Sequence, residues 1–377
     1  CRHPVALPMA SEGDGFGPLA RAIVRGALHV RKGENVVVET WSHSLPYALA
    51  CVVEARRAGA NPLLFLEDEG AFWTCVEEAS PIGRWGRPGA HAWAALSKAD
   101  AVVYFPGPAD RTRYHALPEA VRAELDAHGP DWHRRARVAR LRGVRCALGY
   151  ASDAQASSWG VSPSEWRRHL TRATVEADLP AIARSARSVA AKLRHGRGVR
   201  ITAPNGTDLA LRLRGRSPVI DDGSIGSDDL AHGHNLTVSP PGTVAVAVDE
   251  KSAAGIAIAN RPSFLSQGRV EGGEWEMAGG RLVEARYTAG QAEFDAAFRA
   301  APKGREIVSI LSVGLNPRLG PGVAQVEDQE AGAVTIGIGG NAGYGGSNRC
   351  PFVSWIVVGE ATVAVDGKPL CDRGQLF

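Results

Sequence analysis

The chain has 377 residues, of which 44% are apolar and 22% charged, and its formal net charge is +3. This length and apolar content suit one large or two ordinary packed domains. The small net charge gives no indication of nucleic-acid binding, and no run of about 18 uncharged apolar residues marks a transmembrane helix. The first 17 residues lack the apolar core of a signal peptide, and the six cysteines form no C-x-x-C pair. We therefore expect free thiols in a cytoplasmic protein.

The first half of the sequence alternates short apolar runs with helical patterns. Residues 34–40 predict a buried strand, and residues 61–68 predict a second one, with a helix that begins after Ser44 between them. This βαβ unit implies a parallel pair. Further strands are expected at residues 99–107 and 144–150. No G-x-G-x-x-G follows the first strand, so a dinucleotide site is not indicated.

Two helical features follow in the first half. Residues 132–145 (WHRRARVARLRGVR) form the densest basic run, which we interpret as a solvated helix face, with contact to RNA or an acidic partner as the alternative. Ser162 and Glu165 form a capping box that begins a long helical segment. We predict an α/β N-terminal domain with a parallel sheet over residues 1–197, ending in this helical segment.

The second half changes to short strands separated by Gly, Pro, Asn and Asp, a pattern typical of an antiparallel sheet or barrel. One helix is expected around residues 292–301. We predict a β-rich (barrel-like) C-terminal α+β domain over residues 198–377. The expected strands are residues 199–204, 208–215, 243–250, 255–260, 307–316, 333–340, 352–359 and 362–367.

The glycine-rich segment 333–349 (AVTIGIGGNAGYGGSNR) lacks the lysine of a phosphate-binding loop. Because side chains alternate along a strand, its apolar residues point one way and its small residues the other. The first set is Val334, Ile336 and Ile338, and the second is Thr335, Gly337 and Gly339. The small face leaves room for a ligand or lets another backbone approach closely.

Two polar clusters are candidates for chemistry. In residues 221–235, His232 and His234 would share one face of a strand and could bind a metal with nearby aspartates, although a solvated acidic turn is the alternative. The aspartates are Asp221, Asp222, Asp228 and Asp229. The carboxylates in residues 326–332 could serve in acid–base chemistry or simply form a polar hairpin.

Several segments, taken in chain order, resemble those of the thermophilic metallo-aminopeptidase (aminopeptidase T-like) family and of its relatives, the dihydroxypyridine ring-opening iron dioxygenases. They are residues 145–170, 205–216, 235–259, 311–317, 326–346 and 363–375. The resemblance implies an α/β domain followed by a β-rich domain, a homodimer, and a metal-binding cleft in the second domain.

This sequence departs from the family's pattern at every position where the resemblance implies a metal ligand. Those positions fall on Thr243, near Ile310, and on Thr335, Phe352 and Ser354. None of these side chains is a carboxylate or an imidazole, the ligands that zinc and iron need. No histidine follows His234, so no shift of the alignment restores a late one. We therefore expect no metal and no other cofactor.

From the resemblance we predict a metal-free pseudoenzyme that binds a peptide or peptide-like ligand, for example the precursor in a peptide natural-product pathway, as a dimer with itself or with a related protein. The residues expected at the ligand are Asp222, His232, Thr335, Asn341, Tyr344 and Arg349. A further resemblance, for which no motif can be quoted, is to the peptide-binding proteins of crocagin-type ribosomal peptide biosynthesis.

Two alternatives remain at this point. The first is an enzyme that works without metal, with His232 or His234 as general base and Cys350 as nucleophile. The second is a metalloenzyme whose metal is held at the His-x-His cluster.

Overall fold

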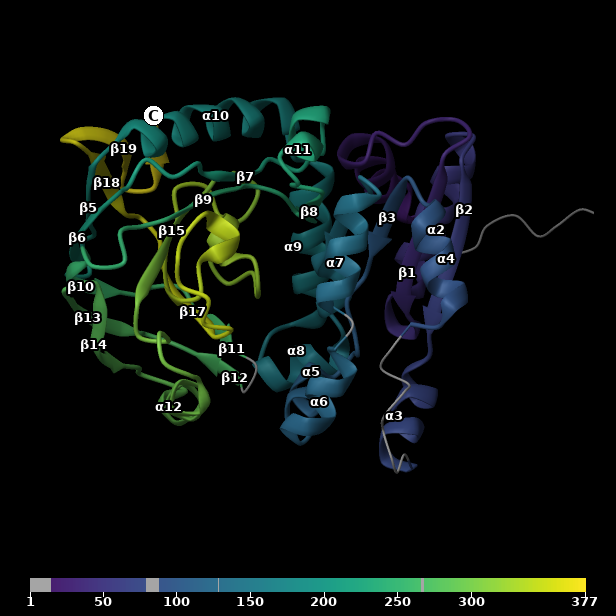
Figure 1. Cartoon of the computed structure of the whole chain (residues 1–377), viewed down its shortest axis with the longest axis horizontal. Helices are drawn as coiled ribbons and strands as arrows, with labels where there is room; N and C mark the ends of the chain where they lie inside the picture. Colours follow the sequence, from purple (N-terminus) through teal and green to yellow (C-terminus); the bar gives the residue numbers. More distant parts are fainter. Residues whose placement is uncertain (1–14, 79–87, 128, 266–267) are drawn as a thin grey trace, which may run out of the picture. The chain divides into compact units, whose positions relative to one another are not determined.

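The computed structural model describes residues 15–78, 88–127, 129–265 and 268–377 (Figure 1). The chain divides into two compact units that interleave in sequence. The first unit comprises Cys1–Ala109, Glu119–Tyr150 and Ile225–Leu236, and the second Asp110–Pro118, Ala151–Ser224 and Thr237–Phe377. The helical segment that the sequence assigns to the end of the N-terminal domain thus groups with the β-rich unit, and the expected boundary near residue 197 is not a boundary of these units.

The first unit is built on a parallel sheet, as predicted. Its strands β1–β4 lie in the order β2-β1-β3-β4, and the backbone carbonyl of Asn235, just before β8 (Leu236–Ser239), accepts from the Gly143 amide of β4. Residues 36–38 of β1 are almost fully buried, as a parallel strand covered on both faces requires. The four strands are β1 (Asn35–Trp41), β2 (Asn61–Glu67), β3 (Ala101–Tyr104) and β4 (Arg142–Cys146).

Helices accompany the sheet of the first unit. They are α1 (Gly17–Arg21), α2 (Leu45–Arg57), α3 (Glu69–Glu78), α4 (Ala90–Lys98), α6 (Glu119–Leu125), α7 (Gly129–Val138) and α11 (Ser227–Ala231). The face that α2 buries carries the small residues Ala48, Cys51 and Ala55, whereas Leu49 and Val53 are nearly half exposed. Small side chains let a helix approach a sheet closely. In α2 the face with small residues is therefore the buried one, and the larger apolar side chains of Leu49 and Val53 remain partly exposed.

The second unit begins with helices and continues in antiparallel sheets. Its helices are α5 (Arg111–His115), α8 (Asp153–Trp159), α9 (Pro163–Val175), α10 (Leu179–His195) and α12 (Gln291–Ala300). The Ser162 hydroxyl accepts from the Glu165 amide at 3.4 Å, which confirms the predicted cap of α9. The expected helix near residue 292 is also confirmed.

Eight antiparallel strands form the larger sheet, in the order β14-β13-β10-β6-β5-β18-β19-β20. These are β5 (Gly198–Thr202), β6 (Asp208–Arg212), β10 (Ala254–Ile258), β13 (Glu274–Ala278), β14 (Arg281–Arg286), β18 (Thr362–Val365), β19 (Lys368–Asp372) and β20 (Gln375–Leu376). A five-stranded antiparallel sheet has the order β17-β16-β15-β9-β7, and β11 pairs with β12. These are β7 (Val219–Asp221), β9 (Thr243–Ala247), β11 (Ser263–Leu265), β12 (Gly268–Val270), β15 (Val308–Gly314), β16 (Val334–Gly339) and β17 (Val353–Val358).

One buried cluster joins the two large sheets and α10 of the second unit, with Trp275, Leu311 and Ile336 among its members. An α/β region with a parallel sheet and a β-rich antiparallel region are both present, so the predicted fold class is confirmed. No helix among the described residues is long and apolar enough to cross a membrane. The cysteines of the described ranges, Cys51, Cys75, Cys146, Cys350 and Cys371, are all free thiols.

Candidate functional site

The glycine-rich strand β16 lies inside the five-stranded sheet, between β15 and β17. Val334, Ile336 and Ile338 are fully buried in the main core cluster. Thr335 therefore points to the opposite side of the sheet. The predicted division of this strand into an apolar face and a small face is confirmed.

The second side of this sheet, which we call the small-residue face, is defined by the strand register. One row across it is Val219, Ala245, Ser312, Thr335 and Val357, the next is Ala247, Ile310, Gly337 and Trp355, and a third is Asp221, Thr243 and Gly314. Most of these side chains have little bulk. The sequence therefore places a wide strip of small residues on adjacent strands.

At the end of β16 the glycines bring two backbones together. Gly339 has a positive φ of +93°, and an added Cβ would lie 2.0 Å from the carbonyl oxygen of Phe352. An added Cβ at Gly340 would lie 2.1 Å from the Cys350 carbonyl oxygen. Of the two interpretations of this small face, close backbone approach is thus the one observed at Gly339 and Gly340.

Three buried side-chain oxygens near the small-residue face have no hydrogen-bond partner within the described ranges: Thr335 Oγ1, Glu327 Oε1 and Gln329 Oε1. Glu327 and Gln329 belong to η5 (Glu327–Gln329), and the backbone carbonyl oxygens of Asp328 and Glu330 lie close to Gly314. Burial raises the pKa of Glu327 well above its usual range. These atoms are therefore candidates to accept hydrogen bonds from a ligand.

An ion pair beside η5 fixes the segment that follows it. Arg261 donates to both carboxylate oxygens of Glu330, at 2.8 and 2.9 Å, and both side chains are largely buried. A bidentate pair of this kind is among the stronger hydrogen-bonding arrangements in proteins. Both oxygens of the Glu330 carboxylate are therefore occupied by Arg261 and serve a structural role.

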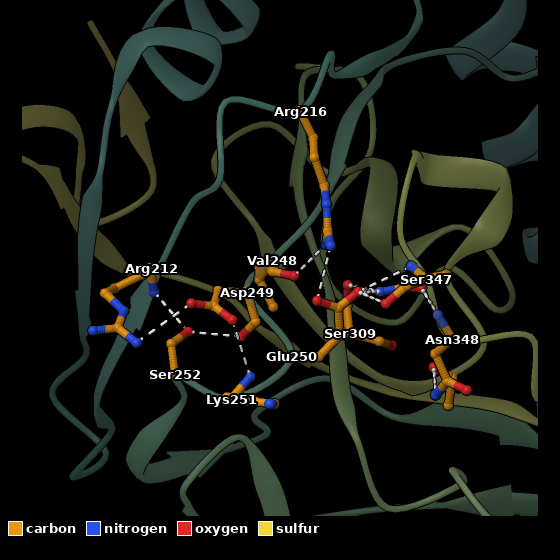
Figure 2. Close-up of polar contacts among 12 residues, drawn as sticks. Arg212, Arg216, Val248, Asp249, Glu250, Lys251, Ser252, Ser309, Ser347 and Asn348 are labelled. Atoms are coloured by element: carbon orange, nitrogen blue, oxygen red, sulfur yellow. Dashed lines mark hydrogen bonds and ion pairs between the residues drawn. The ribbon is translucent and has the colours of Figure 1, made fainter.

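A second network centres on Glu250 and holds the loop after β16 (Figure 2). The Glu250 carboxylate accepts a hydrogen bond from the Arg216 guanidinium at 2.8 Å and one from the side-chain amide of Asn341 at 3.1 Å. It also accepts hydrogen bonds from the backbone amide and the hydroxyl of Ser347, both at 3.0 Å. Burial opposes ionisation of Glu250, but these hydrogen bonds outweigh it and lower its pKa to about 2. The carboxylate is therefore charged throughout the physiological range.

Among the residues predicted to bind the ligand, Asn341 is almost fully buried within this network. Its side-chain oxygen accepts from the Asn348 amide at 2.8 Å, and its side-chain nitrogen also reaches the Ser309 carbonyl at 3.3 Å. Tyr344 is half-buried in η6 (Ala342–Tyr344), and Arg349 is exposed. Asn341, Tyr344 and Arg349 therefore lie on the same loop of the chain, and Thr335 lies on the preceding strand, β16.

Cys350 ends this loop and is buried. Its Sγ lies 3.7 Å from the Pro302 carbonyl oxygen, and its backbone amide donates to Asn348. Nothing in this environment distinguishes it from an inert packed thiol.

The strand that would align His232 and His234 does not form. Residues 227–231 form α11, whose first turn is closed by Asp229 accepting from the Gly226 amide, and His232 is the residue that ends the helix. Both histidines are exposed and belong to the first unit, whereas Asp222 belongs to the second. A helix start with glycine and aspartates in its first turn is favoured over a strand here. Asp222 is half-buried and accepts from the Ser224 amide at 3.2 Å.

Two residues of the second unit, Asp221 and Glu250, were not among the predicted ligand-binding residues, although Asp221 was named as a possible partner of His232 and His234 in a metal site. Asp221, rather than Asp222, lies on the small-residue face, opposite Thr243, where it accepts from the Thr237 hydroxyl. Burial raises its pKa to about 6 despite the hydrogen bonds it receives. Glu250 gave no signal at all, because its partners Arg216 and Asn341 lie 34 and 91 residues away in sequence.

The positions that the family resemblance gives to metal ligands lie on both faces of the five-stranded sheet. Ile310 and Thr335 lie on the small-residue face, whereas Ser354 pairs with Ile338 on the core side. A shift of the alignment by one residue would move the last two positions to Val353 and Trp355, which are apolar and about 40% exposed. No group of three or more His, Cys, Asp or Glu side chains that could hold a metal occurs in the described part of the chain.

Comparison with solved structures gives the fold. The chain is similar to wild-type AmpT (aminopeptidase T) from Thermus thermophilus, with 19% identity, a TM-score of 0.74 and coverage of 97% of this chain and 100% of that one. It is also similar to 2,5-dihydroxypyridine dioxygenase from Pseudomonas putida KT2440, with 14% identity, a TM-score of 0.64 and coverage of 98% of both chains. No protein-family model and no curated protein matches the chain. The chain therefore has the aminopeptidase T-like fold over nearly its whole length.

Proposed function

We propose that this chain is a non-catalytic protein of aminopeptidase-like fold that binds a peptide or peptide-like ligand at the small-residue face and the loop after β16. The observation that carries the proposal is the chemistry of Thr243, Ile310, Thr335 and Ser354. These side chains offer hydroxyls and a hydrocarbon where a metallopeptidase needs carboxylates and imidazoles. No activated water can form without such ligands, so we derive no catalytic step.

The ligand class follows from the hydrogen-bonding groups that remain. Thr335, Glu327 and Gln329 carry buried oxygens that have no donor within the described ranges and would match the N–H groups of a peptide that reaches them. Exposed Arg349 supplies a cation for a ligand carboxylate. A peptide offers both N–H groups and a carboxylate in one molecule. The similarity of the fold to that of an aminopeptidase, an enzyme that acts on peptides, also favours a peptide.

The enzyme alternatives have no observation in their favour. Cys350 is buried and packed, and both His232 and His234 lie at the exposed end of α11 in the first unit. Dimerisation, with itself or with a related protein, and the link to crocagin-type biosynthesis stay predictions.

Metal analysis separates these functions first. Protein purified without chelators is expected to contain far less than one zinc or iron per chain. Stoichiometric metal that disappears in a His232→Ala, His234→Ala double variant would instead establish a metalloprotein and overturn the proposal.

Calorimetric titration with trialanine and with a longer alanine-rich peptide is the second test. We expect binding that weakens in Arg349→Ala but not in Arg187→Ala, a matched control in which an exposed arginine on α10 is removed. Heat signals absent up to millimolar peptide would count against peptide binding, and hydrolysis of either peptide would refute the non-catalytic assignment.

A further inference from the structure

A groove in the first unit lies between α4 and α7. The proposed ligand site, in contrast, is formed by residues of the second unit. The volume of the groove is about 450 Å³, within the range of about 300–1,000 Å³ that ligand pockets occupy. Leu96, Ala136 and Leu141 line it and belong to a buried apolar cluster that also contains Val37 and Val102 of the sheet. The groove therefore opens onto core side chains.

Two tryptophans form the walls of this groove. Trp93 of α4 and Trp132 of α7 are both half-buried and pack against the same apolar cluster. A concave apolar site walled by aromatic rings is suited to an aliphatic or aromatic anchor side chain. Val138, the last residue of α7, lines the groove and is 82% exposed. The apolar lining of the groove therefore includes a side chain that is open to solvent.

The lip of the groove is basic. Arg134 and Arg135 line it, and the Arg135 guanidinium stacks over the Trp93 ring at 4.6 Å. In the described ranges no carboxylate pairs with Arg135 or Arg137, and the Arg134–Asp131 pair is more than half exposed on both sides. Exposed ion pairs of that kind contribute little to stability, so the positive charge of Arg134 and Arg135 stays available to a partner.

We propose that the α4–α7 groove binds an acidic peptide segment of a partner protein, with an aliphatic or aromatic side chain in the groove and its carboxylates on the α7 arginines. Charge complementarity identifies this occupant: the apolar floor requires an anchor, and the arginines at the lip require acidic flanks. The inference does not depend on the proposed function, which concerns the second unit.

Nucleic acid fits the groove less well. One face of the Trp93 ring is covered by Arg135, which leaves less aromatic surface for stacking bases. The basic residues are also confined to one helix of a chain whose net charge is only +3. A groove that leads into an apolar core suits a hydrocarbon anchor better than a nucleotide.

The test uses the full chain and a fluorescein-labelled peptide in which glutamates flank one leucine and one tryptophan. Fluorescence polarisation is expected to show micromolar binding that an Arg134→Glu, Arg135→Glu double variant weakens at least about tenfold. Val138→Glu should weaken it as well, and at 82% exposure that change places little stress on the fold. A peptide with lysines in place of the glutamates should not bind.

Arg168→Glu is the matched control. Arg168 lies on α9, and like Arg134 it is 65% exposed and pairs with an acidic residue three positions earlier. Equal affinity in the double variant and the control, or no binding of the acidic peptide, would overturn the proposal. Preferential binding of single-stranded RNA would overturn it in favour of nucleic acid. Self-association that Val138→Glu abolishes would overturn it in favour of a second copy of the chain.

Discussion

Replacing Glu250 with Gln removes the charge that holds the loop after β16. Gln keeps the shape of the side chain but offers Arg216 no carboxylate, and its amide cannot accept all four hydrogen bonds that Glu250 receives. The Glu250 and Arg216 side chains are only 11% and 14% exposed, so water replaces these contacts poorly. We therefore expect both a loss of global stability and local loosening of the loop.

The magnitude follows from the pKa of Glu250. Lowering it from 4.5 to about 2 corresponds to about 3 kcal/mol at 1.36 kcal/mol per pKa unit, and residual solvent screening reduces this to about 2–3 kcal/mol. The folded-state pKa lies below the unfolded one, so this stabilisation is present above pH 4.5 and is lost as pH falls toward 2. The difference in free energy of unfolding between wild type and Glu250→Gln should therefore shrink in the same interval.

Urea unfolding at pH 7 and at pH 3, with hydrogen exchange at the amides of Ser347 and Asn348, measures both effects. The control is Glu274→Gln, which breaks the exposed pair with Arg286 and should cost less than about 0.5 kcal/mol. A change below about 0.5 kcal/mol for Glu250→Gln at pH 7, with amide protection unchanged, would falsify the view that Glu250 organises this loop.

Three further predictions concern stability. Burial raises the pKa of Glu39 to about 7, so Glu39 should lower wild-type stability as pH rises from 4.5 through 7, and Glu39→Gln should remove this contribution, with a relative gain on the order of 3 kcal/mol at pH 8 by urea unfolding. Gly314→Ala places a Cβ 2.1 Å from the Glu330 carbonyl oxygen and should cost about 1–3 kcal/mol, whereas an unchanged melting temperature would contradict the close packing of η5. Arg261→Lys loses the bidentate contact with Glu330 and should cost about 1–3 kcal/mol, and a loss no larger than that of an exposed pair would show that the geometry is unimportant.

Local patterns in the sequence predicted the features that local physics determines. The period of two in β16 assigned Val334, Ile336 and Ile338 to the core because strand side chains alternate. The cap at Ser162 fixed the start of α9 in the same way. The βαβ unit predicted the parallel sheet, because the connection between two such strands is almost always right-handed and this leaves few possible topologies.

Features that depend on distant residues were not predictable in this way. Glu250 reads as one acidic residue of a hairpin, and only the fold brings Arg216 and Asn341 to it. Asn341 was expected at a ligand, yet its amide is engaged inside the loop, because an isolated sequence does not reveal which polar groups satisfy each other. At His232 the helix start at Gly226 outweighed the alternation that a strand would need.

Four carboxylates near the small-residue face and the loop after β16 bear on the proposed peptide ligand. Glu250 and Glu330 are each paired with a buried arginine, so their charge is already balanced. Burial raises the pKa of Asp221 to about 6 and raises that of Glu327 well above its usual range. A metal site needs ionised carboxylates that are free to coordinate, but Glu250 and Glu330 are paired, burial disfavours the ionised form of Glu327, and Asp221 already accepts from the Thr237 hydroxyl and the Val238 amide. Neutral oxygens and hydroxyls beside a strip of small residues match the N–H groups of an extended chain, which is the chemistry that the proposed peptide ligand requires.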